Sequence, residues 1–390
     1  MSLLFLYNEA INPITGGVER TTYLLAEFLE SRGYIVYFLG LNNIHGVNDK
    51  RQFILPNSTK FCSPENVQFY RNFLIEKSVK LVINKGGTNI ELSELAIYCK
   101  VLDIRLITAI HNSVLGGAKN FSSTHKKQFE QMGIGKFLPL ANTQIIKWGI
   151  LLLYKWRYKD HYRLICKKSD LVILESEKQK EELEFFLKDG NLYNVIGIPN
   201  FIIYDGLQAY HKEKDVLFVG RINTTQKRVD LLLKIWDLIH KEFPNWKLKI
   251  VGGGEELNSI KELSVKLKLR NVFFYGYTDA KPYYESASII CLTSSYEGFG
   301  LTLVEAMQHG VVPIAFNSYL SVTDIIDDKI NGYLISPFDI NEYANTLAKL
   351  MNDEKGLKIV ATKAKVKARK FDLSIIGERW VKVLKDFDIH

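Results

Sequence analysis

The stretch SIICLTSSYEGFGLTLVEAMQHGVVPIAF, residues 288–316, reads as a strand, a glycine-rich turn, a helix and a second strand. Its two apolar ends predict buried strands, and LTLVEAMQHG between them predicts a helix. Gly298 and Gly300 let the backbone approach a ligand, and the helix beginning near Leu301 offers unpaired N–H groups. The turn therefore predicts an anion site of the phosphate-binding kind, although a tight strand-to-helix turn can also hold glycines for structural reasons alone.

Short apolar runs alternate with amphipathic helical patterns along nearly the whole chain. This alternation is typical of βαβ units, which build a parallel sheet. It starts afresh at residue 215, after a segment that has no clear period. The expected strands are 3–8, 35–40, 81–84, 105–111, 171–176 and 194–200 before that point, and 215–220, 247–252, 271–276, 288–294, 311–316 and 332–335 after it.

The fresh start predicts an α/β protein of two Rossmann-like, doubly wound domains that face each other across a central cleft. We assign residues 1–205 to the N-terminal domain and residues 206–370 to the C-terminal domain. The last segment, 371–390, carries Trp380 and several aliphatic residues on one helical face. We expect this final helix to pack back on the N-terminal domain.

The composition predicts a globular protein, because 47% of the 390 residues are hydrophobic and 24% are charged. The four cysteines form no C-x-x-C pair, so we expect neither a zinc site nor a disulfide framework. The apolar N-terminus lacks a basic flank, and no run approaches the roughly 20 apolar residues of a membrane span, so we expect a cytoplasmic protein. The net charge of +8 suits a polyanion, an anionic membrane or a phosphorylated substrate equally.

Two acids, Glu297 and Glu305, stand on either side of the glycine turn. A carboxylate repels a phosphate, so their partners are expected to be hydroxyl groups. Carboxylates accept hydrogen bonds from vicinal diols, as acidic residues do from the ribose of a dinucleotide. A solvated surface glutamate and a helix-end glutamate would give the same pattern without a ligand.

The run E-G-F-G-L-T-L-V-E-A-M, followed by G-V-V-P-I-A, resembles the E-x7-E signature of family 4 glycosyltransferases. That family has the GT-B fold, retains the configuration of the transferred sugar and uses nucleotide-sugar donors. The resemblance implies that Glu305 binds ribose hydroxyls and that Glu297 acts at the donor sugar. It also implies donor contacts along the turn and the start of the helix, at Gly298, Phe299, Gly300, Leu301 and Thr302.

The segment FVGRINTTQKRVDLLL, residues 218–233, resembles the phosphate clamp of the same family. By this resemblance Arg221 and Lys227 contact the donor diphosphate, and two fixed cations can stabilise the charge that develops on this leaving group. One extra residue separates them compared with the usual spacing, so Arg228 is an alternative to Lys227. A solvated basic loop is the other interpretation.

Four further segments extend the resemblance to both halves of the chain. GGVER opens the first helix, so Gly17 is a candidate for backbone contact with the donor phosphates. His111 ends the strand 105–111, where open α/β sheets place ligands, and the family has a histidine there near the transferred sugar. Gly253 and Tyr277 are expected near the nucleotide. Each of these residues also has a purely structural interpretation.

Two further segments bear on the sugar site and on the acceptor. FNSYLSVTDII, residues 316–326, departs from the family pattern of paired glycines and a glutamate, and Asp324 is the candidate for that acid. Residues 136–168 hold eight Lys and Arg against one Asp, interleaved with tryptophans and tyrosines. Such a segment suits an anionic bilayer surface, and equally suits a helix that covers the N-terminal sheet.

Taken together, these features predict a hexosyltransferase for bacterial surface polysaccharide or lipopolysaccharide synthesis. Its N-terminal domain would take a saccharide or lipid-linked acceptor, and its C-terminal domain would bind a nucleotide-sugar, with a UDP-sugar favoured over GDP-mannose. We expect no metal, since no D-x-D-like motif sits where a cation would bridge the donor phosphates, and no other cofactor. A sugar-nucleotide epimerase or a phosphorylase of the same architecture is the alternative enzyme. A basic nucleic-acid-binding protein is the alternative outside enzymology, although no nucleic-acid module is recognised.

Overall fold

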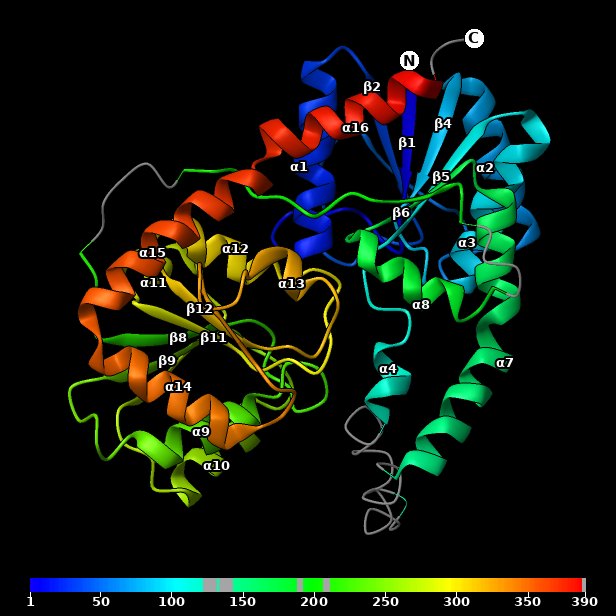
Figure 1. Cartoon of the computed structure of the whole chain (residues 1–390). Coiled ribbons are helices and arrows are strands. Elements are labelled where there is room, and N and C mark those ends of the chain that lie inside the picture. The colour runs from blue at the N-terminus through cyan, green and yellow to red at the C-terminus, as the bar shows by residue number, and fades with distance from the viewer. Residues whose placement is uncertain (122–131, 133–142, 188–191, 206–210, 388–390) are drawn as a thin grey trace. The chain divides into compact units, whose positions relative to one another are not determined.

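The computed structural model describes residues 1–121, 132, 143–187, 192–205 and 211–387 (Figure 1). The chain forms two compact units. The first unit comprises Met1–Val114, Leu152–Phe201 and Leu373–His390, and the second comprises Leu115–Leu151 and Ile202–Asp372. The segment Leu115–Leu151, which lies inside the predicted N-terminal domain, thus groups with the second unit.

The first unit is built on a seven-stranded sheet in which all neighbouring strands are parallel. Its strand order, β3-β2-β1-β4-β5-β6-β7, runs outward in both directions from β1, as in a doubly wound sheet. The strands are β1 (Ser2–Leu6), β2 (Ile35–Gly40), β3 (Gln52–Ile54), β4 (Val79–Asn84), β5 (Arg105–Ile110), β6 (Leu171–Leu174) and β7 (Val195–Gly197).

The strands of this sheet are apolar without alternation because helices cover both faces. On β1, Leu3 and Phe5 enter one core cluster, while Leu4 and Leu6 enter another on the opposite face. The first core is covered by α1 and α16, and the second by α2 and α3. The helices of this unit are α1 (Gly17–Ser31), α2 (Pro64–Glu76), α3 (Ile90–Ile97), α8 (Lys180–Glu184), α16 (Leu373–Phe387) and the later part of α7 (Gln144–Lys168).

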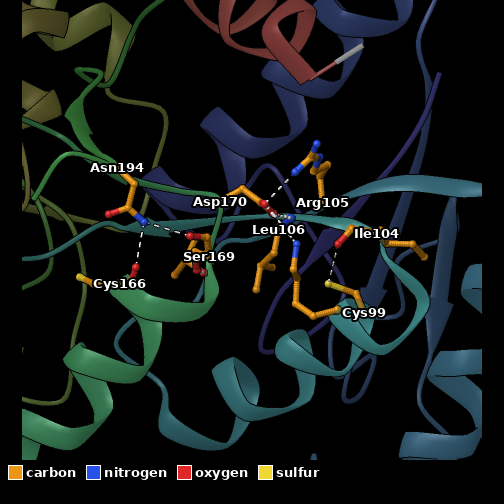
Figure 2. A network of polar contacts seen from close by, with 10 residues as sticks. Cys99, Ile104, Arg105, Leu106, Cys166, Ser169, Asp170 and Asn194 are labelled. Carbon is orange, nitrogen blue, oxygen red and sulfur yellow. Dashed lines mark hydrogen bonds and ion pairs between the residues drawn. The ribbon is translucent and has the colours of Figure 1, made fainter. Parts of the chain in front are cut away.

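A polar network holds the amino end of β5 against the start of β6 (Figure 2). The Asp170 carboxylate accepts from the Leu106 backbone N–H at 2.7 Å and pairs with Lys100 at 2.8 Å and Arg105 at 3.2 Å. Burial would raise the pKa of Asp170, but these donors outweigh it and hold that pKa below its usual value. The network lies at the opposite end of β5 from His111, so it fixes the strand that presents this histidine.

The second unit contains a six-stranded sheet, again parallel at every pair, in the order β10-β9-β8-β11-β12-β13. It repeats the doubly wound pattern about β8. Its strands are β8 (Asp215–Val219), β9 (Lys247–Val251), β10 (Val272–Gly276), β11 (Ile289–Leu292), β12 (Val312–Phe316) and β13 (Tyr333–Ile335). The prediction of two doubly wound α/β domains is therefore confirmed.

Helices also cover both faces of the second sheet. On β8, Val216 and Phe218 enter one core with α9, α10 and α14, while Leu217 enters the other with α11, α12 and α13. The described helices of this unit are α4 (Gly116–Lys119), the early part of α7, α9 (Val229–Ile239), α10 (Leu257–Lys266), α11 (Lys281–Ser286), α12 (Leu301–Gln308), α13 (Val322–Ile325), α14 (Ile340–Asn352) and α15 (Glu354–Ala368). In sheets of this kind ligands bind beyond the carboxyl ends of the strands, where the predicted site residues follow β5, β8 and β11.

Candidate active site

The turn from β11 into α12 requires glycine at position 300. Gly300 caps α12 with φ of 102°, in the left-handed region, and an added Cβ would lie 2.6 Å from the Tyr319 hydroxyl oxygen. The Ser321 hydroxyl donates to the Gly298 carbonyl at 2.6 Å, which fixes the turn. No acidic residue lies in the first turn of α12, so its positive dipole end is not neutralised there. This geometry suits an anion, as the sequence predicted.

Glu297, in the same turn, is held by three donors. Lys227 Nζ lies 2.6 Å from its Oε1, the Ser294 hydroxyl donates to that oxygen at 2.6 Å, and Gln226 donates to Oε2 at 3.3 Å. The side chains of Lys227 and Glu297 are only 15% and 9% exposed. An ion pair this enclosed is maintained only where further hydrogen bonds satisfy both charges. The fold thus brings together two predicted site residues that stand 70 positions apart.

The two alternatives for the second cation differ in their surroundings. Lys227 contacts the predicted site acid, whereas Arg228 pairs with Asp230 at 3.0 Å and lies over the Phe338 ring. Arg228 is the N-cap of α9 and has φ of 51°, in the left-handed region. The geometry therefore favours Lys227. Arg221, the other predicted cation, is exposed immediately after the β8 end.

Glu305 lies on α12, about one turn beyond the glycine turn. The Tyr284 hydroxyl donates to its Oε2 at 2.8 Å. Tyr284 is itself buried and its ring stacks on His309, with 6.1 Å between the ring centroids and 9° between the planes. This fixed phenol orients the Glu305 carboxylate. Tyr284 is a residue that the sequence analysis did not single out.

Three hydroxyl groups around this turn are buried and have no hydrogen-bond partner among the residues that the structure describes. They belong to Ser295, Thr302 and Tyr319. Buried polar groups are usually hydrogen bonded, so such a concentration indicates a place where a polar ligand completes the network. Burial raises the pKa of Tyr319 well above its usual value, and the Glu297 charge adds to this, so the phenol stays protonated and can donate.

The other predicted donor residues of this unit occupy different positions. Gly253 follows β9, and its carbonyl accepts from the Ile222 N–H at 2.8 Å, while Tyr277 after β10 is 72% exposed beside it. Phe299 is buried in the core against Phe371, so its ring does not face solvent. Leu301 is half-buried, and Asp324 lies half-buried on α13. The roles of all these residues stay predictions.

In the first unit, His111 follows β5 and its Nδ1 lies 2.8 Å from Glu175 Oε1. Asn200 donates to the same carboxylate oxygen at 3.1 Å. The other ring nitrogen, Nε2, is buried and has no partner among the described residues. Burial, together with the nearby Lys85 ammonium, lowers the pKa of His111 well below its usual value. The imidazole is therefore neutral at physiological pH.

His111 lines a small cavity of about 20 Å³, enough for a single water molecule. Gly17 begins α1, and Thr21, one turn further along, lines the same cavity. The structure thus brings the first turns of α1 close to the predicted histidine. The remaining lining residues are Leu25, Lys85, Ile110, Ile173, Leu174, Glu175, Ile198, Pro199, Asn200, Phe201 and Trp380.

Lys85 and Glu175 were not predicted from the sequence as site residues. Both are polar residues at the carboxyl ends of apolar strands, β4 and β6, which flank β5 in the sheet. The rule that singled out His111 could have found them too. Among the described residues no group of three or more His, Cys, Asp and Glu side chains is arranged to hold a metal ion. None of the described helices is long and apolar enough to cross a membrane.

A family model described as "Glycosyl transferases group 1" matches residues 203–370. An uncharacterized glycosyltransferase of Haemophilus influenzae is 27% identical over 383 residues, which cover 95% of this chain and 96% of that protein. A Campylobacter jejuni relative is 29% identical over 178 residues, 46% of this chain and 50% of that protein. Its name is GalNAc-alpha-(1->4)-GalNAc-alpha-(1->3)-diNAcBac-PP-undecaprenol alpha-1,4-N-acetyl-D-galactosaminyltransferase. The chain thus spans about half the length of this relative.

Among solved structures, Anabaena HepE in complex with UDP and glucose aligns with a TM-score of 0.74 and 17% identity, over 99% of this chain and 100% of that chain. At this identity the likeness shows the fold alone, and it confirms the GT-B architecture that the motifs implied. The fold and the matched residues agree with the signature read around Glu297 and Glu305. Residues 203–370 match the model of the glycosyl transferases group 1 family, and a glycosyltransferase is the class of enzyme that the motifs predicted and that these comparisons support.

Proposed function

We propose that the chain is a retaining hexosyltransferase that uses a nucleotide-sugar, a UDP-sugar in the first place and GDP-mannose as the alternative. The acceptor is a saccharide or a lipid-linked saccharide of bacterial surface polysaccharide or lipopolysaccharide synthesis. The observation that carries the proposal is the enclosed contact of Lys227 with Glu297 beside the N-terminus of α12. A cation, a carboxylate and a helix dipole meet there, which suits a ligand with both anionic and hydroxyl groups.

In the proposed mechanism, different residues contact the diphosphate, the sugar and the ribose of this ligand. When the bond between the sugar and the diphosphate breaks, negative charge grows on the leaving diphosphate. Lys227, Arg221 and the N–H groups of α12 stabilise that charge, so the proposed transfer is metal-independent. Glu297 accepts from a hydroxyl of the sugar and Glu305 from the ribose diol. Retention of configuration is taken from the resemblance to family 4 glycosyltransferases and is held as an analogy.

The similar proteins support the classes of substrate, a nucleotide-sugar donor and a saccharide or lipid-linked acceptor. HepE was solved with UDP and glucose, and the name of the Campylobacter relative contains an undecaprenol-linked saccharide. These ligands are properties of those proteins. They make a UDP-sugar and a lipid-linked acceptor the first compounds to test here.

Thermal-shift screening with UDP, GDP and ADP, and with their common sugar conjugates, tests the donor. A ligand present at 100 times its Kd stabilises the folded state by about 2.7 kcal/mol, so the correct nucleotide is expected to give a clear shift. The matching nucleoside monophosphate, which lacks the second phosphate, serves as the control and should shift less. Absence of a shift with every nucleotide would contradict the proposal. Epimerised or hydrolysed donor in place of transfer would favour the alternative enzyme class.

The proposal includes peripheral contact with an anionic membrane through part of the segment 136–168, of which 136–142 lies outside the described residues. The described part, 143–168, contains the whole of α7. At spacings of three or four residues, Ile145, Trp148, Leu152 and Trp156 share one helical face and are all exposed. Trp148 is 65% exposed and Trp156 73%. Lysines and arginines next to these residues in the sequence, such as Lys147 and Arg157, supply attraction to anionic lipid.

The double variant Trp148→Ser/Trp156→Ser is expected to weaken binding to phosphatidylglycerol-rich vesicles at least about tenfold, because two large apolar side chains no longer enter the bilayer surface. Vesicle co-sedimentation measures the change, and phosphatidylcholine vesicles should bind little of either protein. Ile359→Ser/Val366→Ser, which removes two exposed apolar side chains from α15, is the matched control. Equal vesicle binding by all three proteins would contradict membrane contact through α7.

A further inference from the structure

A buried charge cluster surrounds His111 in the first unit. Lys85 follows β4, His111 follows β5 and Glu175 follows β6, three strands that are neighbours in the sheet (Figure 1). Lys85 and Glu175 are each only 4% exposed, and all three residues line the same cavity. Burying a lysine and a glutamate is costly, so their presence around one imidazole calls for a physical explanation.

Glu175 determines which nitrogen of His111 carries the proton. A carboxylate only accepts hydrogen bonds, so the 2.8 Å contact requires Nδ1 to donate. Asn200 donates to the same oxygen and holds it in place at 3.1 Å. In a neutral ring with its proton on Nδ1, Nε2 carries a lone pair and accepts. This atom is the one that has no partner within the described residues.

Lys85 acts on the ring through its charge. Among the described residues its ammonium makes no hydrogen bond and lies over the Trp380 ring, 5.4 Å from the centroid. Burial lowers the pKa of Lys85 to about 8, and Glu175 opposes that shift, so the side chain is mostly cationic at neutral pH. A second positive charge on the imidazole beside it is unfavourable. The cavity is otherwise lined by uncharged residues from α1, β5, β6, α16 and the segment after β7, so Lys85 and Glu175 are its charged groups besides the imidazole.

We propose that Glu175 and Lys85 are positioning residues that hold His111 as a neutral hydrogen-bond acceptor, with Nε2 directed to a hydroxyl of the substrate. The inference rests on the proposed glycosyl transfer. A neutral acceptor pairs with a sugar hydroxyl, whereas an imidazolium would pair with a phosphate. The lowered pKa of His111 also makes it a weak base, so its role is to orient a hydroxyl rather than to deprotonate it.

Nitrogen-15 NMR of the histidine rings tests the arrangement without any substrate. The His111→Asn variant identifies the signal of this ring. In the wild-type protein we expect a neutral ring protonated on Nδ1 that does not titrate between about pH 5 and 8. In Lys85→Met the pKa of His111 should rise, and in Glu175→Gln the signal should shift toward the other tautomer. Glu182→Gln, a buried carboxylate nearby that accepts from Ser113 at 2.8 Å, is the matched control and should change neither property.

Kinetics provide the second measurement. Both positioning variants are expected to lower kcat at least about tenfold with little change in the donor KM, because the wrong tautomer or charge misplaces one hydrogen bond. An imidazolium in the wild-type protein at pH 7, or an unchanged tautomer and pKa in both variants, would overturn the inference. If the NMR results are as expected but no sugar is transferred from any donor, the proposed function fails while the arrangement of His111 stands.

Discussion

Replacing Lys227 by methionine is expected to lower kcat for sugar transfer by about a thousandfold. A preorganised charge or donor aimed at developing negative charge contributes roughly a hundredfold to a thousandfold, and Lys227 is half-buried, where water screens it less. Steady-state kinetics with the donor found in the nucleotide screen measure the change. The donor KM should change less than kcat, because the charge on the diphosphate grows as the bond breaks.

The Lys227→Met variant also leaves Glu297 without its cation in a site where this residue is only 7% exposed. Breaking an enclosed ion pair from one side costs about 3 kcal/mol of folding free energy. The double variant Lys227→Met/Glu297→Gln removes both charges and should regain most of this stability, as denaturant unfolding would show, without regaining activity. This separates the loss of the catalytic charge from a loss of fold.

Arg228→Met is the matched control, because Arg228 is the adjacent residue and the alternative that the sequence left open. It pairs with Asp230 instead of the site acid, so its kcat is expected to stay within a few fold of the wild-type value. If Arg228→Met lost activity a thousandfold while Lys227→Met stayed nearly active, Arg228 and not Lys227 would be the second cation at the diphosphate. Normal turnover in both variants would show that neither side chain stabilises the donor diphosphate.

The sequence predicted the parts of the fold that rest on local pattern. Buried parallel strands are continuous apolar runs, so β8 and β11 were visible directly, with ends shifted by one or two residues. The exception is β3 (Gln52–Ile54), a half-buried edge strand of three residues, of which only two are apolar. Edge strands of this length carry too few buried side chains to produce a pattern.

The candidate site was predictable where a motif is contiguous, and not where the fold joins distant residues. The turn around Gly298 and Gly300 is local, so its glycines and both acids could be proposed from the sequence alone. The contact of Lys227 with Glu297 joins residues 70 positions apart, which no spacing in the sequence encodes. The same limit explains why Tyr284, which orients Glu305 from α11, was not recognised.

Replacing Glu305 by alanine is expected to raise the Kd of the nucleoside diphosphate about tenfold to a hundredfold. A carboxylate that accepts from a ribose diol makes charge-assisted hydrogen bonds, and each contributes about 1.5–3 kcal/mol. Isothermal titration calorimetry with the nucleotide found in the screen measures the change. Tyr284→Phe removes the phenol that orients this carboxylate and should give a smaller loss, of about threefold to tenfold.

The 2′-deoxy form of the same nucleotide shows which atoms Glu305 contacts. The wild-type protein should bind the deoxy nucleotide more weakly than the ribonucleotide, because one hydroxyl of the diol is missing. Glu305→Ala should bind both equally, since the partner of that hydroxyl has been removed, so the two changes are coupled. If the variant discriminates between the nucleotides as strongly as the wild-type protein does, Glu305 does not contact the ribose. The carboxylate would then act elsewhere on the donor, and the division of hydroxyl groups between Glu297 and Glu305 would be wrong.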